Sequence, residues 1–118
     1  PSTAATSALP ELSGFTGTHK GRAALAEFAL STSDLRRIID VPSDGRDHAL
    51  GDVVVGRDGT VYATDSLAPI IWKYTPGAEE LEKLVESPAF YSLQGLVLSD
   101  KALVVADYAN GLFVIDLT

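Results

Sequence analysis

Residues 48–74, HALGDVVVGRDGTVYATDSLAPIIWKY, decide the fold of this chain. They contain three short runs rich in β-branched and aromatic residues, a composition typical of strands. The first two runs, at about 51–55 and 60–64, are joined by Gly56-Arg57-Asp58-Gly59, and Asp-Gly between apolar runs is a strong hairpin signal. The third run, at about 69–74, ends before a Pro-Gly pair, which stops a strand. The stretch therefore predicts a three-stranded antiparallel meander.

The same pattern returns at residues 92–117, SLQGLVLSDKALVVADYANGLFVIDL. Gly51 aligns with Gly95 at an offset of 44, and Asp65 aligns with Asp107 at an offset of 42. A repeat of this length, built from strands and turns, is typical of β-propeller blades, each of which is a four-stranded antiparallel meander. The sequence therefore predicts an all-β chain made of propeller blades.

The repeat divides the chain into four segments. We expect a flexible N-terminal arm at 1–20, the outer strands of a first blade at 21–46, a complete second blade at 47–91, and the first three strands of a third at 92–118. The arm either supplies a strand to a neighbouring blade or is a ragged end.

Two segments combine helical and strand signals. Ala23–Leu30 is rich in alanine and leucine, and Ala78–Glu86 has apolar residues at helical spacing. We predict a strand for both, because pairing within a sheet overrides weak propensity in short segments. Leu35–Val41 is predicted as the partner strand of the first of them.

A chain of 118 residues is too short to close a propeller, which takes at least about four blades of roughly forty residues. Three interpretations stay open: a part of a six-bladed ring, a unit that completes a ring by self-association, and an open stack. A repeat unit does not bury its hydrophobic face alone. We therefore expect exposed apolar faces at both ends.

The composition excludes several partners and sites. A net charge of −7 opposes binding to nucleic acid and to anionic membranes, which both require a basic patch. The absence of cysteine excludes disulfides and thiolate metal sites. No apolar run approaches the roughly eighteen residues of a membrane helix. None of these features indicates a compartment.

The repeats resemble the six-bladed propellers of the regucalcin/gluconolactonase (senescence marker protein) family, and of its strictosidine-synthase, paraoxonase and NHL-type relatives. The resemblance rests on GRDGTVYATDS (56–66), SLQGLVLSD (92–100) and VVADYANGLFVIDL (104–117), and it covers about residues 22–118. It implies a central channel holding a divalent cation, usually Ca²⁺. It also implies hydrolysis of a small lactone or ester, with the cation polarising the bond and a nearby carboxylate or histidine handling the proton.

The resemblance implies three site residues. Gln94-Gly95 stands where the family often has Asn-Gly, so Gln94 is a candidate ligand of the cation through its carbonyl oxygen. Gly51-Asp52 stands where the family has Asn-Asp, so Asp52 is a candidate ligand and catalytic carboxylate. His48, near the same rim, is either the candidate base or simply a loop residue. Any further ligands would have to come from other blades or another chain.

Asp65 and Asp107 recur at the same place in each unit, after the second strand. Recurrence favours repeat architecture, so we expect each carboxylate to accept hydrogen bonds from the turn that it opens.

The sequence leaves two functions open: a cation-dependent lactone or ester hydrolase, and a non-catalytic propeller module that binds a peptide, glycan or protein partner.

Overall fold

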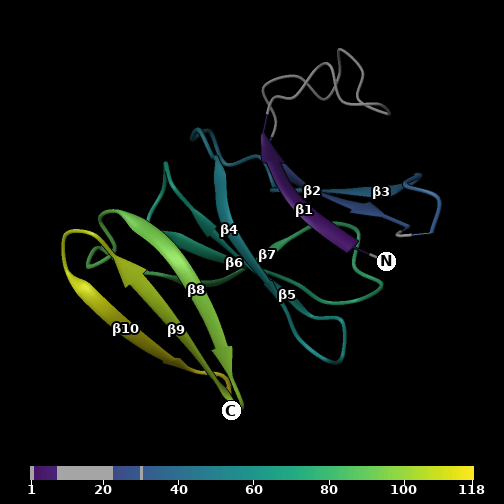
Figure 1. Cartoon of the computed structure of the whole chain (residues 1–118). Helices are drawn as coiled ribbons and strands as arrows, with labels where there is room; N and C mark the ends of the chain where they lie inside the picture. The colour runs from purple at the N-terminus through teal and green to yellow at the C-terminus, as the bar shows by residue number, and fades with distance from the viewer. Residues whose placement is uncertain (1, 8–22, 30) are drawn as a thin grey trace.

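The computed structural model describes residues 2–7, 23–29 and 31–118, and over these ranges the chain is all-β (Figure 1). The described strands form three antiparallel sheets, and each sheet is a meander in chain order. Sheet A contains β1 (Ser2–Ser7), β2 (Ala23–Phe28) and β3 (Leu35–Asp40); sheet B contains β4 (Leu50–Val55), β5 (Val61–Asp65), β6 (Ile70–Tyr74) and β7 (Glu82–Glu86); sheet C contains β8 (Leu93–Ser99), β9 (Ala102–Asp107) and β10 (Gly111–Asp116).

The all-β prediction is confirmed, and both segments with mixed signals are strands. The alanine-rich segment forms β2, and the acidic segment after Pro76-Gly77 forms β7 at the outer edge of sheet B. Within the described residues there is no helix, so none is long and apolar enough to cross a membrane.

The N-terminal segment differs from the expected flexible arm in its first residues. Ser2–Ser7 forms β1, which pairs antiparallel with the whole of β2. The rest of the predicted arm, with His19, lies outside the described residues. Pairing with a neighbouring strand supplies the order that the small and polar sequence of β1 does not indicate by itself.

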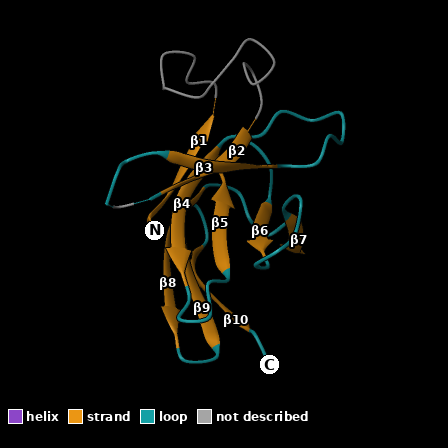
Figure 2. Ribbon diagram, turned by 90° about the vertical axis from the view of Figure 1, so that its right-hand side faces the viewer, coloured by secondary structure: helices purple, strands orange, loops and turns teal. Residues whose placement is uncertain are grey.

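Sheet B lies between the other two sheets, and both of its faces are buried (Figure 1). Alternate residues of β5 and β6, among them Ala63 and Trp72, pack with Leu25 and Ile39 of sheet A. The residues between them face sheet C, where the cluster contains Tyr62, Ile71, Phe90, Leu93, Leu96, Leu103 and Val105. The outer strand of sheet A, β3, runs across the strands of sheet B (Figure 2).

A tight turn joins β4 to β5 as the Asp-Gly signal predicts. The N–H of Gly56 donates to the carbonyl of Thr60 at 2.7 Å, and Oδ1 of Asp58 accepts from the N–H of Thr60 at 3.0 Å. Gly59 adopts a φ of 88°, a left-handed conformation that favours glycine. The turn therefore depends on the residue types that identified it.

The first strands of sheets B and C each contain a bulge. The positions of these bulges show that the predicted alignment of the two repeats is wrong by one residue in these strands. The register shifts between Leu50 and Val53 in β4, and between Leu93 and Leu96 in β8. Gly51 therefore occupies the position of Gln94 rather than that of Gly95. A Cβ at Gly51 would lie 3.2 Å from Oγ1 of Thr64, whereas sheet C has Ala106 at the position equivalent to Thr64.

The central position of sheet B predicts the effect of a core truncation. Ile71→Ala removes a side chain with no exposed surface from the layer between sheets B and C. We expect the free energy of unfolding in urea to fall by about 2–5 kcal/mol, through lost burial and a residual cavity. Leu67→Ala, at a site that is 62% exposed, should change it by less than about 1 kcal/mol. Equal effects of the two variants would contradict the sandwiched arrangement.

Candidate functional site

His48 lies in the loop before β4, and each of its ring nitrogens meets a carboxylate. Nδ1 is 2.6 Å from Oδ2 of Asp65, and Nε2 is 2.7 Å from Oδ1 of Asp44. The ring meets Trp72 edge-on, with 5.5 Å between the ring centroids. Only 6% of the His48 side chain is exposed. The imidazole is therefore enclosed by two carboxylates and an indole.

The two carboxylates decide the charge of His48. Burial by itself lowers the pKa of the imidazole, but the hydrogen bonds to Asp44 and Asp65 together outweigh it and raise that pKa. The hydrogen bond with His48, with support from Arg46, lowers the pKa of Asp44 to about 2. The site thus stabilises the imidazolium, which donates from both nitrogens. In that form His48 has no nitrogen that could accept a proton as a general base.

The loop that carries Asp44 is joined to the edge of sheet B. Arg46 pairs with Asp44, with 3.0 Å between Nη2 and Oδ2, and with Glu86 of β7, with 2.9 Å between Nη1 and Oε2. A hollow of about 380 Å³ lies beside this loop; its lining includes His48, Arg46, Ser43, Asp40 and Glu80. The ion pairs of Arg46 therefore hold the loop before β4 against β7, at the edge of sheet B.

Asp65 and Asp107 have the structural role that their recurrence predicts. Oδ1 of each accepts hydrogen bonds from the N–H groups two and three residues further along, at 3.0 and 3.1 Å after Asp65 and at 2.9 and 3.1 Å after Asp107. Oδ2 of Asp65 also accepts from Nε1 of Trp72 at 3.0 Å. Burial acts to raise the pKa of Asp107, but its backbone hydrogen bonds outweigh that effect and lower it. The expectation for both turns is confirmed.

Asp52 joins sheet B to sheet C. Its Oδ2 accepts a hydrogen bond from the N–H of Leu96 in β8 at 2.8 Å, and its Oδ1 accepts one from the N–H of Val53 at 3.0 Å. Its own N–H donates to Oγ1 of Thr64 at 3.0 Å, and that hydroxyl lies 3.4 Å from the carbonyl of Gln94. The carboxylate of Asp52 thus pairs with backbone donors on two neighbouring strands.

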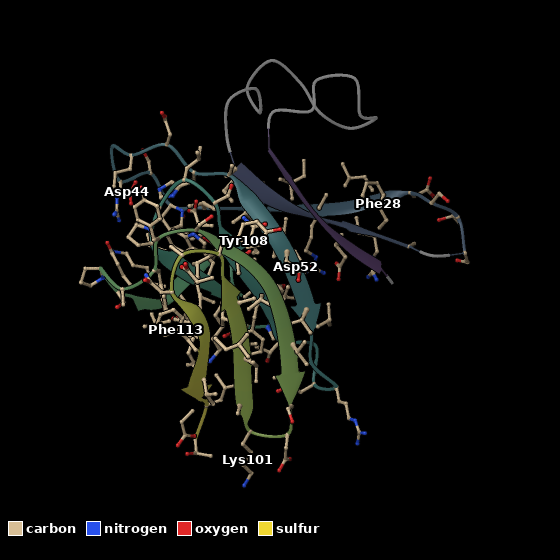
Figure 3. The ribbon with its side chains drawn as sticks, turned by 60° about the vertical axis from the view of Figure 1, so that its left-hand side comes forward. Phe28, Asp44, Asp52, Lys101, Tyr108 and Phe113 are labelled. Carbon is tan, nitrogen blue, oxygen red and sulfur yellow. The ribbon has the colours of Figure 1, made fainter. Side chains whose placement is uncertain are left out.

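The structure does not bring the three predicted site residues together. His48 contacts Asp65, Trp72 and the loop at Asp44, whereas the carboxylate of Asp52 turns to β8. Figure 3 shows Asp44 and Asp52 well apart. The side chain of Gln94 is exposed, and its Nε2 lies 3.5 Å from Oγ of Ser92. No shared site for His48 and Asp52 results.

A calcium ion requires several oxygen ligands that converge on one point. Both carboxylate oxygens of Asp52 already accept backbone N–H groups, and Gln94 brings one amide beside it on the next strand. Over the described ranges, no group of three or more His, Cys, Asp or Glu side chains is placed to hold a metal ion. The residues that the resemblance assigned to a cation do not form a fitting ligand set.

Sequence reasoning missed Asp44 and Trp72 as partners of the polar cluster. The available signal was the spacing of four residues between Asp44 and His48, but such spacing is informative on a helix and this segment is a loop. The ring of Trp72 packs between sheets A and B, while its N–H donates to Asp65.

A second hollow, a groove of about 980 Å³, lies where the β4–β5 and β8–β9 turns approach each other. Each turn contributes one cation and one anion: Arg57 and Asp58 from the first, Lys101 and Asp100 from the second. Most of the remaining lining is apolar and consists of Val54, Val55, Tyr62, Leu98 and Leu117, with Gly56 and Thr118 beside them.

Comparisons of the chain with protein-family models, with curated proteins and with solved structures found no match.

The raised pKa of His48 predicts how stability depends on pH. The ion-paired cluster should contribute fully between the ordinary pKa of Asp44, 3.8, and the ordinary histidine pKa of about 6.5. Its contribution should be lost as the pH rises through the folded-state pKa of His48, and also as the pH falls through that of Asp44. NMR titration should give a pKa for His48 above 6.5, and Asp44→Asn should lower it by removing one carboxylate. His48→Gln assigns the signal against that of His19. A value at or below 6.5 in the wild type would contradict this account.

The contacts of Asp52 and Gln94 predict unequal effects of truncation. Asp52→Ala leaves the N–H of Leu96 without its acceptor and should lower the free energy of unfolding by about 1–3 kcal/mol. Gln94→Ala removes an exposed side chain and should change it by about 0.5 kcal/mol or less. Urea denaturation of both variants in the same buffer provides the measurement. A larger loss of unfolding free energy for Gln94→Ala than for Asp52→Ala would contradict the structural roles given to these two side chains.

Proposed function

We propose that the chain is a non-catalytic, propeller-type binding module whose three sheets are successive blades. The first strands of the sheets, β1, β4 and β8, lie side by side in this order. Inner strands of neighbouring propeller blades have this relation around a central channel. Face-to-face burial of sheet B by both neighbours supports the same interpretation.

The observation that carries the non-catalytic assignment is the use of the candidate side chains within the scaffold. Both nitrogens of His48 meet carboxylates, and both carboxylate oxygens of Asp52 accept backbone N–H groups. With these hydrogen bonds made, His48 has no ring nitrogen and Asp52 no carboxylate oxygen without a partner inside the fold. The cation-dependent lactone or ester hydrolase stays a prediction that these contacts do not favour.

The groove between the β4–β5 and β8–β9 turns is the proposed binding surface, and an extended peptide is its proposed occupant. The apolar lining suits alternate apolar side chains of a strand-like segment. Each wall presents one positive and one negative side chain, so the groove complements a peptide with charges of both signs. A polyanion would meet Asp58 and Asp100 as well as the cations, which disfavours nucleic acid.

Selection of peptides from a random phage-displayed library on the immobilised chain tests the proposal. The synthetic peptides so obtained should bind the wild type in calorimetry, and the double variant Arg57→Glu, Lys101→Glu should weaken binding at least about tenfold. Arg36→Glu changes another exposed arginine, on β3, and should leave affinity unchanged. Equal loss in all variants, or no enrichment of peptides, would overturn the groove as the binding surface.

The hydrolase is tested separately by adding Ca²⁺ or EDTA. A non-catalytic module should keep its melting temperature in both, and should not hydrolyse gluconolactone or phenyl acetate with Ca²⁺ present. A rise in melting temperature with Ca²⁺, together with hydrolysis abolished by Asp52→Asn, would replace the proposal with the hydrolase.

A further inference from the structure

Sheet C has one face packed on sheet B and one open apolar face. Along β10 the residues alternate, so Phe113 and Ile115 point to sheet B while Leu112 and Val114 are 73% and 71% exposed. Val97 of β8 is 61% exposed on the same open face. Two rows of side chains cross the middle of this open face, and neither row contains a charged residue.

The open face has a regular pattern across all three strands. Val97 pairs with Val104, and Val104 pairs with Val114, so three valines form one row across the sheet. Ala106 and Leu112 form the next row towards the β9–β10 turn. β-Branched side chains in register on a twisted sheet are suited to packing against another sheet. We call these five residues the valine face.

The valine face is the repeat equivalent of the face of sheet B that sheet C covers. Val54 pairs with Tyr62, and Tyr62 with Lys73, in the row that corresponds to the three valines. Thr64 and Ile71 correspond to Ala106 and Leu112. In sheet B this surface is buried, with Ile71 fully inaccessible. In sheet C the same surface is more apolar, because Val114 replaces Lys73, and it is exposed.

We propose that the valine face is a dimerisation surface on which a second copy of this chain seats its own valine face. An uncharged row of valines is complementary to itself, as a two-fold contact requires. Closure of a ring by end-to-end association would instead place the valine face of one chain against the outer face of sheet A of the next chain. That face carries Ala24 and Ala26, which are 2% and 0% exposed and already buried within the chain. The two valine faces are therefore the matching apolar surfaces.

The net charge of the chain should make dimerisation through the valine face depend on ionic strength. Each chain carries a net charge of −7, so two chains repel one another at low ionic strength. Raising NaCl from about 50 mM to about 500 mM shortens the screening length from more than 10 Å to less than 5 Å and should strengthen the dimer. An association driven by ion pairs would weaken under the same change.

Light scattering and sedimentation over a tenfold concentration range test the proposal on the whole chain. We expect the mass to rise from one chain to two, and to stop there. Val97→Lys with Val114→Lys should weaken dimerisation at least about tenfold, because each lysine would be buried without a partner. Val55→Lys is the matched control, since Val55 is 50% exposed and lies on β4. Circular dichroism of each variant checks that it folds.

Cross-linking separates the proposed contact from other associations. The chain has no cysteine, so Val104→Cys and Val55→Cys each introduce a single thiol. A short bifunctional maleimide should link two chains through Val104→Cys and not through Val55→Cys. A constant mass of one chain would overturn the proposal. A closed trimer or larger ring that survives the lysine substitutions would overturn it as well, in favour of end-to-end assembly.

Discussion

Each repeat depends on the hydrogen bonds that the aspartate carboxylate at the end of its second strand accepts. In sheet B, Asp65 accepts hydrogen bonds from the following turn, from Trp72 of the third strand and from the histidine before the first. In sheet C, Asp107 joins its turn to the backbone that leads into β8. One buried side chain thus fixes three strands relative to one another. An apolar residue there would leave several N–H groups without acceptors.

The strands of the repeats could be predicted from sequence because their signals are local. Asp58-Gly59 and Asn110-Gly111 both lie at turns, and the β-branched runs between the turns pair as expected. The bulges could not be predicted in the same way. A bulge is defined by the partner strand, and the two repeats show it as Gly51-Asp52 and as Gln94-Gly95. Aligning the glycines therefore shifted the repeats by one residue.

The candidate site was less predictable because its roles depend on contacts between sheets and loops. Asp52 resembles a channel carboxylate in sequence, but the bulge directs it to the N–H of Leu96 on the next sheet. His48 resembles a free loop histidine, but the path of the preceding loop places Asp44 against its second nitrogen. Neither partner adjoins its residue in the chain, so neither could be read from a short motif. The groove depends in the same way on two turns far apart in sequence.

Burial of sheet B on both faces also sets the order in which the chain opens. Strands in the middle of a stack lose contacts with two neighbours when they separate, whereas an outer sheet loses contacts with one. We therefore expect sheets A and C to open first while β5 and β6 remain paired, so that the backbone amides of these two strands exchange last with solvent. Transient detachment of sheet C would uncover Ile71 and Tyr62, so the same stacking that orders the core also defines its first route to aggregation.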